Sequence, residues 1–106
     1  MPKYLFQASY TQEGLRGLME DGATGRREMA EQLVASLGGS IEAFYYAFGD
    51  SDLYVISELP DDASAAAASV AVGASGTASI KTTVLVTPET IDEAVKKSMG
   101  YPPPGS

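Results

Sequence analysis

Apolar and polar positions along the chain switch between the period of a strand and the period of a helix. Segments rich in β-branched and aromatic residues, each bounded by turn residues, are predicted strands: residues 3–10, 40–48, 52–59 and 78–86. The second and third of these flank Gly49-Asp50-Ser51-Asp52, a turn sequence that predicts a β-hairpin.

Three helices are predicted between and after the strands. The first covers 11–37, with Thr11 as N-cap and a kink or short loop near 21–25, where two glycines each lower helix stability by about 1 kcal/mol relative to alanine. The second covers 63–76, where small side chains let a helix lie close on a sheet; a low-complexity linker is the alternative. The third begins at Thr87-Pro88-Glu89, where cap, proline and acidic residue stand in their preferred positions.

The order of these elements is β-α-β-β-α-β followed by a helix, which predicts an α+β fold of ferredoxin-like type. Right-handed crossovers place both main helices on one face of a four-stranded antiparallel sheet. We expect residues 1–99 to form a single domain, because 106 residues are the usual length of one. Residues 100–106 are rich in proline and are expected to form an extended tail.

The sheet face opposite the helices is predicted to be apolar. If small residues such as Ala8, Ala43 and Ser57 lie beneath the alanine-rich helix, Tyr45 shares that helix-covered face. The opposite, open face then holds the expected interface residues Phe44, Tyr46, Phe48, Tyr54, Ile56 and Leu85. Strands about 4.8 Å apart and residues rising about 3.3 Å each give this face roughly 400 Å², as large as the largest apolar patch of a typical monomer.

A face of this kind needs a cover. We expect a second copy of the chain to pack on it across a twofold axis, which gives a closed or nearly closed α/β barrel in a homodimer or a higher oligomer. The alternative is a cover by the C-terminal helix, but its apolar stripe, Ile91, Val95 and Met99, is narrow for this face.

Composition removes several classes of function. The chain contains no Cys, His, Trp or Asn, so a disulfide, a thiolate nucleophile, an imidazole base and the usual zinc sites are excluded. A net charge of −7 argues against nucleic-acid and anionic-membrane partners. We expect no cofactor. Because the first residues lack the apolar core of a signal peptide and begin directly with a strand, we expect a cytoplasmic location.

Four acidic residues near the hairpin and the second helix suggest a divalent-cation site at first sight. The segment that starts at Asp50 lacks both the turn glycine and the bidentate glutamate of a calcium loop. We expect Asp50 and Asp52 to shape the turn and Asp61 or Asp62 to cap a helix, and we predict no metal site.

Two further groups are candidate binding residues. Arg26 and Arg27 stand at a helix start and are candidates for anion binding; the alternative is ion pairing with Glu28, Glu31 or an acid across the dimer. The candidate ligand-binding residues of the barrel interior are Gln7, Tyr46, Tyr54 and Lys81. The alternative is that such aromatic side chains fill the core and the interface.

The opening PKYLFQASYTQEGLRGL, the middle SLGGSIEAFYYAFGDSDLYVISELPDD and the alanine-rich helix resemble the GYD-domain family over about 2–95. In the turn that gives the family its name, Gly49 and Asp52 match and the tyrosine is absent. The resemblance implies small bacterial proteins of dimeric α/β-barrel type. It implies no established reaction.

Two hypotheses about function remain open after these observations. The first is a non-catalytic, self-associating barrel protein that binds a small molecule between its sheets. The alternative is a cofactor-free oxygenase, isomerase or decarboxylase-like enzyme that acts on a small aromatic or oxygenated substrate with tyrosine, lysine or carboxylate groups. A purely structural or regulatory oligomer, docking through its tail, is a third hypothesis.

Overall fold

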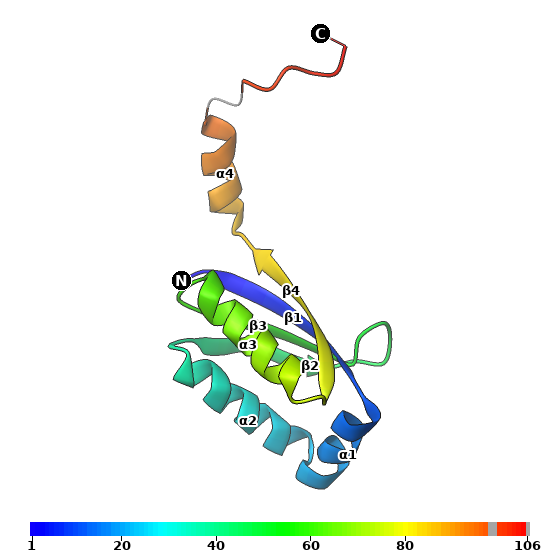
Figure 1. The fold of residues 1–106 in the computed structure, drawn as a ribbon. Helices are drawn as coiled ribbons and strands as arrows, with labels where there is room; N and C mark the ends of the chain where they lie inside the picture. The colour runs from blue at the N-terminus through cyan, green and yellow to red at the C-terminus, as the bar shows by residue number, and fades with distance from the viewer. Residues whose placement is uncertain (98–99, 106) are drawn as a thin grey trace.

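A computed structural model of the protein describes residues 1–97 and 100–105, which form one four-stranded antiparallel sheet and four helices (Figure 1). The strands are β1 (Lys3–Tyr10), β2 (Ser40–Tyr46), β3 (Leu53–Glu58) and β4 (Ala78–Leu85). The helices are α1 (Gln12–Asp21), α2 (Ala23–Ser36), α3 (Asp62–Ala74) and α4 (Pro88–Lys96). The strand order is β2-β3-β1-β4, with α2 and α3 on one face. The predicted α+β, ferredoxin-like fold is confirmed.

The predicted break in the first helix is a complete one. Gly22 adopts a φ of 78° between α1 and α2, a backbone conformation that favours glycine. Thr11 caps α1 by accepting a hydrogen bond from the Gly14 N–H, as expected, whereas Thr24 lies inside the first turn of α2 and does not cap it. Gly38, with a φ of 85°, ends α2 as predicted.

The core lies between the sheet and helices α2 and α3. Every second residue of β1 and β3 is buried, and Tyr4, Ser57 and Leu59 are the most completely buried side chains. The Tyr4 hydroxyl donates a hydrogen bond of 2.7 Å to the Asp62 carboxylate in the first turn of α3. Buried alanines on α3, such as Ala65, let this helix lie close to the sheet, as its composition predicts.

A β-bulge in β2 overturns the predicted faces of that strand. Between Ile41 and Ala43 the register with β3 shifts, so that Glu42 is an extra residue and the alternation inverts after it. Phe44 therefore pairs with Val55, and both lie on the helix-covered face.

The same shift moves the neighbouring aromatic residues. Tyr46 pairs with buried Leu53 and faces the helices, whereas Tyr45 pairs with Tyr54 on the open face. Ala43, expected beneath the helices, also lies on the open face, opposite Ile56. The predicted faces of Ala43, Phe44, Tyr45 and Tyr46 were therefore wrong, because strict alternation was assumed through the bulge.

Phe48 also differs from its prediction. Strand β2 ends at Tyr46, two residues earlier than expected, and Phe48 lies in the following turn with its side chain fully exposed. The open face of the sheet, as the structure has it, is formed by alternate residues of all four strands. Its apolar members are Leu5, Ala43, Tyr45, Tyr54, Ile56 and Leu85.

Helix α4 does not cover the open face. It extends beyond the end of β4, away from the sheet (Figure 1), and all of its side chains, Ile91 and Val95 among them, are exposed. Met99, the third member of the predicted stripe and the expected end of the domain, lies outside the described residues. No helix within residues 1–97 and 100–105 is both long and apolar enough to cross a membrane.

Candidate functional site

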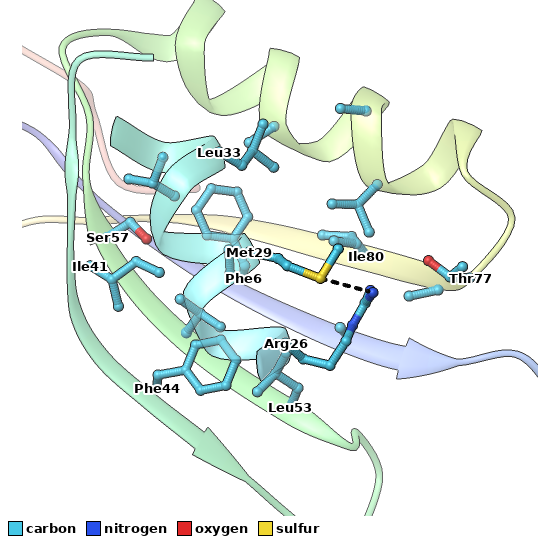
Figure 2. A pocket seen from close by; sticks show the side chains of 18 of the residues that line it. Phe6, Arg26, Met29, Leu33, Ile41, Phe44, Leu53, Ser57, Thr77 and Ile80 are labelled. Carbon is cyan, nitrogen blue, oxygen red and sulfur yellow. Dashed lines mark hydrogen bonds between the residues drawn. The ribbon is translucent and has the colours of Figure 1, made fainter. Parts of the chain in front are cut away.

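A cavity of about 280 Å³ lies between the sheet and helices α2 and α3 (Figure 2). Its wall is mostly apolar and comes from both helices and from all four strands. Large apolar side chains in it include Phe6, Met29, Leu33, Phe44, Leu53 and Ile80. Because β2 inverts its alternation at the bulge, Phe44 is part of this wall rather than of the open face.

Small residues on both the helices and the sheet help to explain why this space is not filled. Ala30 on α2, Ala68 on α3, and Ala8 and Ala78 of the sheet all line the cavity. Side chains that end at Cβ cannot span the distance between a helix and a sheet, which are normally separated by interlocking larger side chains. The volume is about twice the 150 Å³ of an engineered protein cavity that holds benzene.

Ser57 places a polar group in this apolar wall. Its side chain on β3 is 0% exposed, and its Oγ has no hydrogen-bond partner among the described residues. Figure 2 shows the hydroxyl directed toward the space enclosed by the other lining side chains. A buried hydroxyl without a partner costs about 1–3 kcal/mol, so a partner supplied by a ligand would recover that free energy.

Arg26 lies at the other end of the cavity. Its side chain leaves the first turns of α2 and extends toward the β4 side, where Thr77 and Ile80 lie (Figure 2). The guanidinium Nη1 is 3.3 Å from the Asp21 carboxylate and 3.6 Å from the Met29 sulfur. Only 24% of the Arg26 side chain is exposed. The structure therefore holds a positive charge at the boundary between the cavity and the solvent.

Tyr10 adds a second polar group at this end. Burial, and after it the neighbouring Tyr46 hydroxyl, raises the pKa of Tyr10 to about 12. Its phenol therefore stays protonated at neutral pH and can donate a hydrogen bond. Tyr46 donates to the Ala23 carbonyl at 3.1 Å, and Asp52 accepts from the Tyr10 backbone N–H at 2.8 Å. These contacts fix the end of the hairpin against the start of α2.

The structure brings together three of the four predicted ligand-binding residues. Gln7 of β1 lies directly beside Tyr54 of β3 on one side and Lys81 of β4 on the other, all on the open face. Tyr46 is not part of this row, because the bulge turns it toward the helices, and Tyr45 takes its place opposite Tyr54.

The two candidate anion-binding arginines are separated. Arg26 lines the cavity and pairs with Asp21, whereas the next residue, Arg27, is exposed to solvent and takes part in none of the ion pairs found among residues 1–97 and 100–105. The pairing of Arg26 with Asp21 was not anticipated, since the expected partners were Glu28 and an acid across the dimer.

The predicted helix cap is confirmed at Asp61, whereas the Asp52 side chain bonds the backbone of β1 and not that of its own turn. Asp61 caps α3 by accepting a hydrogen bond of 2.8 Å from the Ser64 N–H. The Ser64 side chain and backbone together lower the pKa of Asp61 below 3.8. Within the described part of the chain, no three acidic side chains come together in a group that could hold a metal ion.

Comparison with known proteins gives one match. No curated protein and no solved structure resembles this chain closely enough to match. The family model described as the GYD domain matches residues 4–95, which include all of the sheet except Lys3, the cavity lining and most of α4. The chain therefore belongs to the GYD-domain family, as its opening and middle segments indicate.

Proposed function

We propose that this GYD-domain protein binds a small, largely apolar molecule in the cavity between α2, α3 and the sheet, and that it does not transform the molecule. The observation that supports this most directly is the buried hydroxyl of Ser57, which has no partner among the described residues and points into an apolar cavity of about 280 Å³. A concave apolar site with a few polar groups is the usual form of a small-molecule site.

The lining favours binding over catalysis. Its polar side chains are Tyr10, Arg26, Ser57, Ser75 and Thr77, and among the described residues it contains neither a carboxylate nor a lysine. With its pKa raised to about 12, Tyr10 is a poor general base at neutral pH. A cofactor-free enzyme needs a base that contacts the substrate, so this lining supports the enzyme hypothesis less well.

The test is a titration with decanol, followed by methyl NMR spectra. Leu33 and Ile80 line the cavity, and their methyl signals are expected to shift in a saturable manner, whereas those of Leu85 on the open face are expected to stay unchanged. The variant Ala30→Leu fills part of the cavity and is expected to weaken binding at least tenfold. Ala35→Leu on the exposed side of the same helix is the matched control. Saturable binding that Ala30→Leu leaves intact would place the ligand elsewhere, and no binding would reject the proposal.

We also propose that the protein acts as a homodimer in which the open faces of two sheets pack against each other. The support is an apolar face that α4 leaves uncovered (Figure 1). Of the predicted interface residues, Tyr54, Ile56 and Leu85 retain this role, and Leu5, Ala43 and Tyr45 join them in place of Phe44, Tyr46 and Phe48. Polar residues such as Gln7 and Lys81 share this face, so with about half of roughly 400 Å² apolar on each subunit, covering it contributes on the order of 10 kcal/mol before the costs of association.

Light scattering at micromolar concentration tests the dimer. Ile56 lies near the centre of the open face, paired with Leu5 and Ala43, so Ile56→Lys is expected to give monomers. Val70→Lys, on an exposed position of α3, is expected to leave the dimer intact. A wild-type protein that is monomeric at this concentration would contradict the proposal. The cytoplasmic location remains a prediction.

A further inference from the structure

The polar groups of the cavity lie at its two ends, with apolar side chains between them. Tyr46 pairs with Leu53 in the sheet and donates to Ala23, which places the start of α2, and with it Arg26, over the Leu53 end of β3. Ser57 lies four residues beyond Leu53 on β3, about 13 Å from it at a rise of about 3.3 Å per residue, and the Arg26 guanidinium extends sideways from the Leu53 end toward β4. Figure 2 shows Ser57 near Ile41, its partner in the sheet, and the Arg26 guanidinium directed toward Ile80 and Thr77.

The Arg26 end is suited to an anion. The described contacts of the guanidinium engage Nη1 only, through Asp21 and the Met29 sulfur. A guanidinium has five N–H donors, and two parallel ones match the oxygens of a carboxylate. The Asp21 partner is 40% exposed, and an ion pair of this exposure is weak, so a ligand carboxylate can share or replace it. The protonated Tyr10 phenol and the Thr77 hydroxyl line the same end and offer further donors.

The Ser57 end is suited to a single polar atom. The Ser57 Oγ can donate one hydrogen bond and accept others, and it does neither within the described part of the chain. A purely hydrocarbon ligand would leave it unsatisfied, whereas a hydroxyl or keto oxygen that displaces the side chains now covering the Ser57 Oγ would satisfy it.

The length and the volume of the cavity agree on the size of the ligand. The span of about 13 Å along β3, from Leu53 to Ser57, corresponds to a chain of roughly ten carbons, because C–C bonds of about 1.5 Å advance an extended chain by roughly 1.25 Å each. By volume, the benzene comparison gives roughly eleven non-hydrogen atoms for 280 Å³.

We propose, on the basis of the binding function above, that the ligand is a linear amphiphilic acid of roughly eight to ten carbons. Its carboxylate lies against Arg26, and a hydroxyl or keto oxygen at its far end contacts Ser57. The neutral, apolar middle of the molecule lies between Phe6, Leu33 and Ile80, which line the cavity between the two polar ends.

Calorimetric titration with ω-hydroxydecanoate, decanoate and decanol tests both contacts. The hydroxy acid is expected to bind about tenfold more tightly than decanoate, and decanoate about tenfold more tightly than decanol. In Ser57→Ala, the hydroxy acid is expected to bind no more tightly than decanoate, while decanoate still binds more tightly than decanol. In Arg26→Met, decanoate is expected to bind no more tightly than decanol, while the hydroxy acid still binds more tightly than decanoate. The matched controls, Ser79→Ala and Arg27→Met, alter exposed side chains and are expected to change neither.

The outcomes separate this inference from the binding function on which it rests. Equal affinities of the wild-type protein for decanol and decanoate would overturn the role of Arg26, while cavity binding would stand. An equal loss of affinity for all three molecules in Ser57→Ala would overturn the contact at the far end. Binding of none of the three molecules would reject the cavity as a ligand site altogether.

Discussion

Removing the Ser57 hydroxyl is expected to stabilise the ligand-free protein. The side chain is completely buried and its Oγ has no partner among residues 1–97 and 100–105, so the folded state bears the cost of an unsatisfied polar group, about 1–3 kcal/mol. Ser57→Ala deletes this one oxygen and leaves the Cβ and the backbone pairing with Tyr4 in place. We expect the free energy of unfolding to rise by about 1–2 kcal/mol.

Urea denaturation of the ligand-free protein, followed by circular dichroism, measures this difference. At roughly 4–8 °C per kcal/mol for a domain of this size, the melting temperature is expected to rise by about 4 °C or more. Ser79→Ala, an exposed serine on β4, is the control and should stay within about 0.5 kcal/mol of the wild type.

The sign of this change in the free energy of unfolding shows whether the Ser57 hydroxyl lacks a hydrogen-bond partner in solution. A Ser57→Ala protein that is as stable as the wild type, or less stable, would mean that the hydroxyl has a partner in solution, for example an ordered water in the cavity. The Ser57 end of the cavity would then hold no unsatisfied hydrogen-bonding group, and the proposed contact between Ser57 and the hydroxyl or keto oxygen of the ligand would have no support.

Two further predictions concern the packing around the site. An alanine at Gly14 would place its Cβ against the Thr77 carbonyl oxygen, so Gly14→Ala is expected to cost about 3 kcal/mol or more in thermal denaturation, whereas Gly17→Ala, with open space around it, should be neutral or stabilising. The hydrogen bond to Asp62, together with burial, raises the pKa of Tyr4 from 10.0 to about 12. Because the pKa of Tyr4 is higher in the folded state than in the unfolded state, the stability that its protonated phenol contributes is complete below pH 10 and is lost as the pH rises toward 12. The free energy of unfolding of Tyr4→Phe should therefore fall less steeply over this alkaline range. An equally steep fall in the variant would refute the role given to Tyr4.

The architecture was predictable because local signals and topology agree. Turn and cap residues mark most element boundaries: Thr11, Asp61 and Thr87 each accept a hydrogen bond from the backbone N–H three residues further on. With the boundaries set, the handedness of the crossovers leaves few arrangements of four strands and two covering helices.

The faces of β2 were not predictable by the same means. Alternation assigns faces only while the register is continuous, and the sequence around Glu42 carries no glycine or proline that would announce a bulge. This error also affected the predicted interface and ligand-binding residues, because Phe44 and Tyr46 were expected on the open face and lie on the covered one.

The cavity was missed for a different reason. Its existence depends on where small residues of different elements meet, and the sequence does not show which of Ala8, Ala30 and Ala68 come to lie opposite one another. One signal was present: Ser57 is the single polar residue on the buried side of β3, between Val55 and Leu59. A lone hydroxyl in such a series is a reason to look for something that it binds.

The extra residue in β2 also limits how roles can be transferred between members of the family. In a relative of equal length whose β2 pairs without this bulge, the aromatic residues that follow would exchange sides, so that a residue of the covered face in one protein would align with a residue of the open face in the other. Deleting Glu42 removes its 2.7 Å ion pair with Lys3 at the surface but cuts into no buried side chain. Such a deletion would also leave every later residue on its present face, because Ala43 would then follow Ile41 in regular alternation. Aromatic groups would move between the interior of the domain and its open face only if Glu42 were kept and paired within the ladder.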